Sequence, residues 1–198
     1  EKVDKMSKIV NNYIYNVIYQ ILTLILPIIT IPYISRVLGS EGVGINAYTY
    51  SIVQYFMLLA SIGLSLYGNR EIAYVRDDRH KLSKTFWGIF YLRVITTLVA
   101  YILFLVFLSF VNTYHHIFLI QSINIISIAI DVSWLLMGIE DFKKTVVRNI
   151  FVKLIGLIFT LLFVKAPGDL WKYVLILSIT NLLGNLSLWF YLPKLVNK

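Results

Sequence analysis

The chain has 198 residues, of which 59% are hydrophobic and only 14% are charged, with a net charge of +8. A soluble domain usually carries about a quarter of its residues as charged side chains, so this composition excludes an ordinary soluble protein and indicates one surrounded mostly by lipid. The chain contains no cysteine, which excludes disulfide bonds, cysteine nucleophiles and cysteine-ligated metals.

The predicted elements are long apolar stretches separated by short polar breaks. A membrane-spanning helix needs about 20 mostly apolar residues, whereas membrane-barrel strands have about 10 residues of alternating polarity. In chain order the predicted spans are 13–35, 44–67, 86–111, 116–138, 146–164 and 170–192. We therefore expect an all-α integral membrane protein in which residues 1–198 form a single bundle of six transmembrane helices.

The first predicted span contains Pro27 and Pro32. Proline removes a backbone donor and kinks a helix, which lipid tolerates where neighbouring helices or a cavity satisfy the freed carbonyl groups. The prolines therefore indicate either an ordinary kink or a bending helix that opens a cavity. Gly39, Gly42 and Gly44 follow and predict a tight turn on the outer side of the membrane.

Basic residues are unevenly divided between the two sides that six spans define. Most of the 18 Lys and Arg residues fall on the side that holds both termini: Lys2, Lys5, Lys8, Arg70, Arg76, Arg79, Lys81, Lys84, Lys143, Lys144, Arg148, Lys194 and Lys198. The other side holds Arg36, Lys165 and Lys172. Because Lys and Arg favour the cytoplasmic side, we expect both termini in the cytoplasm. Basic loops on this side lie against the anionic headgroups of the membrane. This placement explains the positive net charge, so no nucleic-acid partner is needed to account for it.

Three charged residues lie well inside predicted spans, away from the ends of the spans. Arg93, Asp131 and Lys153 are on different helices, each about seven residues, or ~10 Å, from the predicted cytoplasmic end. Charges inside spans usually face the bundle interior and pair with one another, so we expect Asp131 to pair with Lys153, Arg93 or both. One interpretation is an ion pair that fixes helix packing. The other is a cavity with a spare cation, suited to an anionic substrate.

The remaining polar residues give no catalytic or metal motif. Asn46, Gln54, Gln121, Asn124, Asn181 and Asn185 lie in spans and are expected to hydrogen-bond between helices. His115 and His116 are adjacent in an outer loop, which is a poor arrangement for a metal. The sequence therefore predicts neither a metal nor a cofactor, and no enzyme activity.

Two regions carry a resemblance to a known family. The strings "SRVLGSEGVG" and "LYGNREIA", after a proline-rich first span, and "SWLLMGIEDFKKTVVRN" near the end of the fourth span resemble bacterial polysaccharide flippases of the Wzx type, within the larger group that includes multidrug extruders. The positions that match the family motifs are Arg36, Gly39, Glu41, Gly42, Gly44, Gly68, Arg70, Glu71, Trp134, Gly138, Glu140 and Asp141.

The resemblance implies a carrier in the bacterial inner membrane. Such proteins are expected to move undecaprenyl-diphosphate-linked sugar units from the inner to the outer leaflet through a cationic cavity, beside membrane lipids and polysaccharide polymerase machinery. Two alternatives remain open. One is a cation-coupled drug extruder, in which Asp131 carries the proton or sodium ion. The other is an integral-membrane sugar or acyl transferase.

The chain departs from the family in length. Family members have roughly twice as many helices, arranged as two bundles that flank the cavity. The resemblance therefore implies that this chain corresponds to the amino-terminal half of a flippase, whether as a truncated product, an excerpt, or a half that pairs with a second six-helix half.

Overall fold

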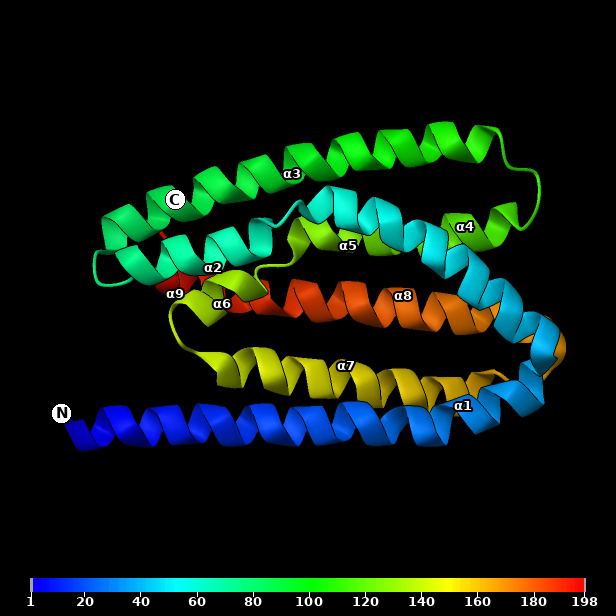
Figure 1. Cartoon of the computed structure of the whole chain (residues 1–198), viewed down its shortest axis with the longest axis horizontal. Helices are drawn as coiled ribbons and strands as arrows, with labels where there is room; N and C mark the ends of the chain where they lie inside the picture. The colour runs from blue at the N-terminus through cyan, green and yellow to red at the C-terminus, as the bar shows by residue number, and fades with distance from the viewer. Residues whose placement is uncertain (1, 198) are drawn as a thin grey trace.

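The chain is described by a computed structural model that covers the backbone of residues 2–197. Among the first twenty residues, side chains are described at positions 13, 14, 17, 18 and 20, so the expectations for the amino-terminal lysines lie outside the described side chains. The described backbone is helical between short connections (Figure 1). The all-α prediction is confirmed.

The first helix, α1 (Lys2–Ser61), contains the first predicted span and most of the second. Its backbone leaves helical geometry at Gly39, where φ is 71° and ψ is 176°, rather than at either proline. A positive φ suits glycine because it has no Cβ. Figure 1 shows the chain reversing direction at this end of the bundle, so two antiparallel segments follow each other without an intervening loop.

The second predicted span ends earlier than expected. Ile62 and Gly63 both have positive φ, and α2 (Leu64–Val75) begins directly after them. Asp78 then caps α3 (Arg79–Ser109) by accepting hydrogen bonds from the amides of His80 and Lys81. These amides hold the pKa of the Asp78 carboxyl below its usual value. Most of the polar break between the second and third predicted spans, residues 68–85, is therefore helical, with a short turn between α2 and α3.

The fourth predicted span is divided into shorter helices. They are α4 (His115–Gln121), α5 (Ile123–Ile130) and α6 (Ser133–Gly138). The prediction of Asp131 inside a continuous helix is wrong, because Asp131 has extended backbone angles of −72° and 111° and ends α5. Apolar residues continue on both sides of this break, so the sequence alone gave no sign that the helix is interrupted there.

The last part of the chain forms two long antiparallel helices. They are α7 (Phe142–Phe163) and, after η1 (Pro167–Asp169), α8 (Leu170–Ser187), which continues into η2 (Leu188–Tyr191) and α9 (Leu192–Leu195). Their positions agree with the fifth and sixth predicted spans. Figure 1 shows α7 lying between α1 and α8.

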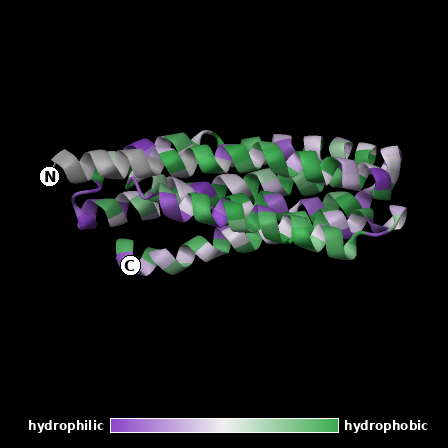
Figure 2. Cartoon of the chain, turned by 90° about the horizontal axis from the view of Figure 1, so that it is seen from below, coloured by the Kyte–Doolittle hydropathy of each residue, from purple (hydrophilic) through white to green (hydrophobic). Residues whose placement is uncertain are grey.

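Five segments within the described residues are long and apolar enough to cross a membrane: Gln20–Val75, Arg79–Ser109, His115–Gly138, Phe142–Phe163 and Pro167–Leu195. Many large apolar side chains point outward, including Leu66 at 79% and Phe110 at 80% exposure. Figure 2 shows hydrophobic residues along most of the helix length. Such an exterior matches lipid as the surrounding solvent.

Helices α2 and α6 approach closely through two glycines. A Cβ at Gly68 would lie 2.6 Å from Cε3 of Trp134, and a Cβ at Gly138 would lie 2.6 Å from Cγ2 of Ile72 and 2.9 Å from the carbonyl oxygen of Asn69. Neither site has room for a methyl group without movement of its neighbours. The two glycines therefore set the spacing of this helix pair.

Gly138→Ala is expected to destabilise the protein by about 1–3 kcal/mol, because the added methyl group must displace backbone as well as the Ile72 side chain. Gly88→Ala is the matched control: its Cβ would meet nothing within 4 Å, and alanine is favoured over glycine in a helix by about 1 kcal/mol. Thermal unfolding of the purified variants in detergent measures both. Equal midpoints for the two variants would contradict the close packing of α2 and α6.

Candidate functional site

The candidate site is built around the helix break at Asp131. The backbone amide of Ser133 donates to Oδ1 of Asp131 over 3.0 Å, so the carboxylate starts the short helix α6. A break at membrane depth leaves carbonyl groups without helical partners, and lipid offers them none. The break therefore needs donors from neighbouring side chains.

Four side chains supply those donors. Asn185 Nδ2 donates to the carbonyl of Ser127 (3.0 Å), Arg93 Nε to Ile128 (2.6 Å), Trp189 Nε1 to Ile130 (2.8 Å) and Trp134 Nε1 to Asp131 (3.1 Å). They come from α8, α3, η2 and α6, so the bundle closes around the break from several directions. The sequence analysis did not predict this role for the two tryptophans. It could have been inferred only if the position of the helix break had been known.

Arg93 is the most enclosed charge of the site, with a side chain that is 2% exposed. In addition to the Ile128 carbonyl, it donates to Oγ of Ser65 (3.2 Å) and to Oδ2 of Asp131 (3.4 Å). Its guanidinium therefore connects α2, α3 and the end of α5. The predicted pairing of Asp131 with Arg93 is confirmed.

Asp131 also contacts a second arginine, which the sequence analysis counted with the basic residues of the cytoplasmic side. Arg148 of α7 lies 3.7 Å from Oδ1 of Asp131 through Nη2, and its Nη1 donates to Oδ1 of Asn185 over 2.8 Å. Arg148 lies five residues before Lys153, which is about 140° around a helix of 3.6 residues per turn. Since α7 begins four residues earlier than the predicted span, Arg148 lies six residues after the start of the helix rather than at its end.

We call Arg93, Asp131 and Arg148 the charge cluster. Its two arginines and one carboxylate give it a net charge of +1, and Asp131 keeps 22% of its side-chain surface exposed while bridging the two. The predicted place of Lys153 in this cluster stays a prediction. The charge cluster joins α3, α5 and α7 at one level of the bundle.

A row of amides continues from the charge cluster toward the other end of the bundle. Asn185 Nδ2 also donates to Oγ of Ser127 (2.7 Å), Asn124 Nδ2 to Oγ of Ser178 (2.9 Å), Asn181 Nδ2 to Oδ1 of Asn124 (3.3 Å) and Gln121 Nε2 to Oδ1 of Asn46 (3.2 Å). The predicted interhelical hydrogen bonds are confirmed for these amides. Gln54 is exposed.

The residues of the family motifs fall outside the charge cluster. Gly68, Trp134 and Gly138 pack α2 against α6, and Gly39 makes the bend in α1. A Cβ at Gly42 would lie 2.9 Å from Cβ of Leu38, whereas a Cβ at Gly44 would meet nothing within 4 Å. Apart from Gly44, these positions have packing or backbone roles.

The charged motif residues lie at the surface. Glu140 has a positive φ of 61° and pairs with Arg76 over 2.6 Å, and Asp141 pairs with Lys144 over 2.6 Å. Arg70 lies 3.5 Å from its neighbour Glu71 and is 66% exposed; Arg36 and Glu41 are also exposed. The Arg76–Glu140 pair ties the end of α2 to the end of α6.

A groove of about 1030 Å³ lies between α7 and the segment from α8 to α9. We call it the α7–α8 groove. Arg148 lines it, so the charge cluster and the groove share one cation. Within the described residues, no group of three or more His, Cys, Asp and Glu side chains is placed to hold a metal.

Comparison with known proteins agrees with the sequence motifs. A family model described as "Polysaccharide biosynthesis protein" matches residues 9–197. The chain is 26% identical over 178 residues to an Escherichia coli (strain K12) protein, covering 88% of this chain and 43% of that protein. It is 29% identical over 146 residues to a Shigella dysenteriae protein, covering 73% and 37%. Both are named "Putative O-antigen transporter".

The chain spans less than half the length of these two relatives. No solved structure matches it significantly. The resemblance seen in the motifs is confirmed by the family match, which covers nearly the whole chain.

Proposed function

Because the chain belongs to the polysaccharide biosynthesis protein family, we propose that it works in a carrier for surface polysaccharide synthesis. The cargo is an oligosaccharide repeat unit linked through a diphosphate to undecaprenyl, and the carrier moves it from the inner to the outer leaflet of the bacterial cytoplasmic membrane. The names of the two relatives favour this cargo over the drugs of an extruder, and favour transport over a sugar or acyl transfer reaction.

The observation that carries the proposal is the charge cluster at a broken helix inside the bundle. Ionisable groups within the membrane are costly and usually mark a substrate or ion pathway. Interrupted helices are typical of transporters, where they lie at the substrate site. Asp131 supplies both features, since it ends α5 and bridges two arginines.

The cations have distinct parts in the proposed mechanism. Arg93 holds the end of α5 in place through its bonds to Ile128 and Asp131. Asp131 in turn orients Arg148, which reaches the α7–α8 groove. The net positive charge of the cluster, with Lys153 further along α7, attracts the diphosphate of the cargo, because arginine forms strong charge-assisted hydrogen bonds with phosphate.

The architecture proposed for the complete carrier has two bundles. The segment Gln20–Val75 has 56 residues, more than twice the length that one crossing needs, so the bend at Gly39 divides it into two crossings and gives this bundle six. The relatives are more than twice as long as the matched region, which leaves room for a second bundle that completes the cavity. Polysaccharide polymerase machinery would receive the exported units.

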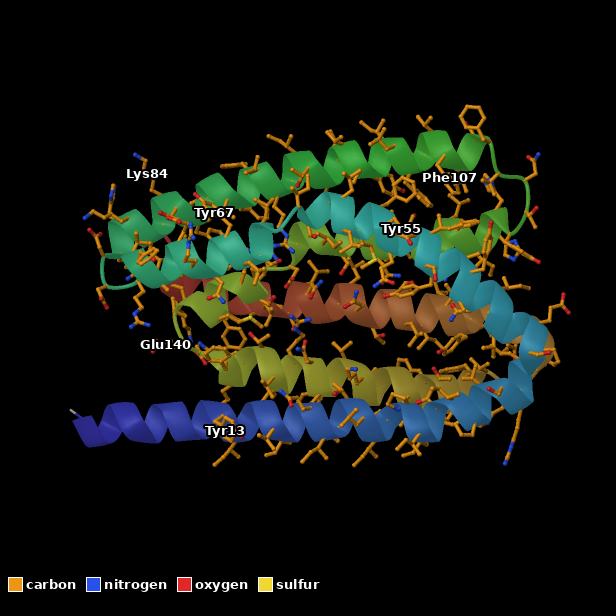
Figure 3. All side chains as sticks on the ribbon, in the orientation of Figure 1. Tyr13, Tyr55, Tyr67, Lys84, Phe107 and Glu140 are labelled. Carbon is orange, nitrogen blue, oxygen red and sulfur yellow. The ribbon has the colours of Figure 1, made fainter. Side chains whose placement is uncertain are left out.

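The proposed topology places both termini and the turn between α2 and α3 in the cytoplasm. Figure 3 shows Lys84 and Glu140 at one end of the bundle and Phe107 at the other. Because basic residues gather at the first of these ends, it is the cytoplasmic one. The loop after α3, which contains Thr113, then faces outward.

Single cysteines at Lys84 and Thr113, both exposed, test this topology in a chain that has no cysteine of its own. A membrane-impermeant thiol reagent is expected to label Thr113→Cys in intact cells and to label Lys84→Cys only after the cells are opened. Labelling of Lys84→Cys in intact cells would reverse the orientation.

Deletion of the gene tests the function. The deleted cells are expected to lose surface polysaccharide and to accumulate lipid-linked repeat units in the inner leaflet, and a plasmid copy is expected to restore export. Susceptibility to toxic cations and dyes is the control, and should not change. Normal polysaccharide together with new drug sensitivity would favour the extruder alternative.

A further inference from the structure

The α7–α8 groove has a positively charged end. Its lining there includes Lys143, Lys144, Arg148 and Lys194, against one carboxylate, Asp141. The charge balance remains positive when Asp131, the partner of Arg148, is added. These charges lie at the predicted cytoplasmic end of the groove, where the membrane surface is anionic.

The start of α7 adds a second attraction for an anion at the same end. This helix of 22 residues begins at Phe142, and the side chain of its N-cap residue Asp141 does not cap the first backbone amides. Asp141 instead pairs with Lys144 over 2.6 Å. The first amide groups of a helix lack helical partners and, together with the helix dipole, favour a bound anion.

The rest of the groove is shaped for a hydrocarbon chain. Val147, Phe151 and Ile155 recur at every fourth residue and form one face of α7. On the α8 side the lining includes Leu183 and the smaller residues Thr180, Gly184 and Ser187. Gly184 packs against Val152 of α7, where a Cβ would have no room.

The groove opens to the outside of the bundle. Phe151 is 61% exposed, Leu183 56% and Phe190 83%, and all three line it. Exposed apolar surface of this kind contacts hydrocarbon in a membrane. The groove thus combines an anion-attracting end near the headgroups with an apolar length that faces the membrane interior.

We infer that the α7–α8 groove is a binding site for an anionic phospholipid of the inner leaflet. The phosphate of the headgroup lies among Lys143, Lys194 and the start of α7, and an acyl chain follows the apolar face of α7. This lipid is a resident of the membrane rather than the transported cargo. Its phosphate gives Arg148 a second anionic neighbour beside Asp131. Binding of the lipid therefore changes the electrostatic surroundings of the charge cluster.

Photocrosslinking in living cells identifies the occupant. The photoreactive residue p-benzoylphenylalanine is placed at Phe190, and the mass of the adduct is measured after irradiation. We expect adducts of phosphatidylglycerol, enriched over phosphatidylethanolamine relative to the bulk membrane. The same residue at Tyr91, which is 60% exposed on α3, is the control and should report the bulk lipid ratio.

Two charge-matched variants test the headgroup contacts. Lys143→Gln with Lys194→Gln is expected to lower the phosphatidylglycerol share at position 190 about thirtyfold, since each of the two basic residues contributes roughly 1 kcal/mol toward anionic lipid and about 1.4 kcal/mol is a factor of ten. Lys81→Gln with Lys84→Gln removes the same charge outside the groove and should leave that share unchanged.

Three results would overturn the site. They are equal lipid ratios at positions 190 and 91, an undecaprenyl-linked adduct, which would place the cargo in the groove, and a crosslink to protein, which would make this surface an interface between bundles. The adduct mass does not depend on export activity. A failure of the proposed transport function would therefore leave the lipid result standing, and a failure of the lipid site would leave transport standing.

Discussion

Asp131→Ala is expected to cause the largest loss of folded protein of any single substitution in the charge cluster. The change leaves Arg93, which is 2% exposed, and Arg148, which is 12% exposed, without their shared carboxylate, and it removes the acceptor for the Ser133 amide that starts α6. Removing one partner of a buried ion pair costs about 3 kcal/mol or more. The amount of protein that migrates as a single species after extraction in mild detergent measures the loss.

Two further variants separate charge from capping. Asp131→Asn keeps an oxygen for the Ser133 amide but loses the charge, so it should fall between the wild type and Asp131→Ala. Asp131→Ala combined with Arg148→Met should recover part of the yield, because the double change leaves one fewer charge without its partner. A double variant no better than Asp131→Ala would show that Arg148 draws no stability from this carboxylate.

Arg93→Lys is expected to lower polysaccharide export per folded molecule about tenfold, the equivalent of one charge-assisted hydrogen bond of about 1.5 kcal/mol. Lysine keeps the charge but cannot reach Ser65, Asp131 and the Ile128 carbonyl together, as the fork of arginine does. Arg93→Ala should abolish export and also lower the folded yield. Surface polysaccharide divided by the amount of folded protein gives the measurement.

Arg70→Ala is the matched control for Arg93, because Arg70 is 66% exposed and contacts its own neighbour Glu71. It removes the same charge and should leave export near the wild-type level. Unchanged export per folded molecule in both Arg93 variants would assign Arg93 to helix packing alone and would remove it from the transport mechanism.

The sequence predicted the all-α fold and the long apolar helices, because the length and composition of such helices are set by lipid thickness, which a window of 20 residues can read. It failed where the backbone departs from a helix without a change in composition. The apolar residues around Asp131 do not indicate that Asp131 has an extended backbone. A turn at Gly39 could be predicted, because glycine tolerates backbone angles that other residues rarely adopt.

The pairing of charges was predicted only in part, for a related reason. Their equal depth in the predicted spans indicated that Arg93 and Asp131 pair, and the two side chains are in contact in the structure. Arg148 was counted at the cytoplasmic surface because it lies only two residues into the predicted span. The helix in fact begins one turn earlier, at Phe142, which places Arg148 deep enough to reach Asp131. The groove could not be predicted at all, because it is lined by α7 and by the segment from α8 to α9, and its shape depends on how these elements pack together.

The two indole groups that cover the carbonyls of Ile130 and Asp131 give the protein an intrinsic optical reporter. Trp134 and Trp189 lie on either side of the break in the helix, and indole emission changes when its N–H partner or its exposure to water changes. With Trp87 and Trp171 replaced by phenylalanine, the emission of the two remaining tryptophans would report changes in hydrogen bonding or water exposure at this break. A fluorescence trace would then show whether the break moves during the proposed transport cycle, which sugar analysis records only as an end product.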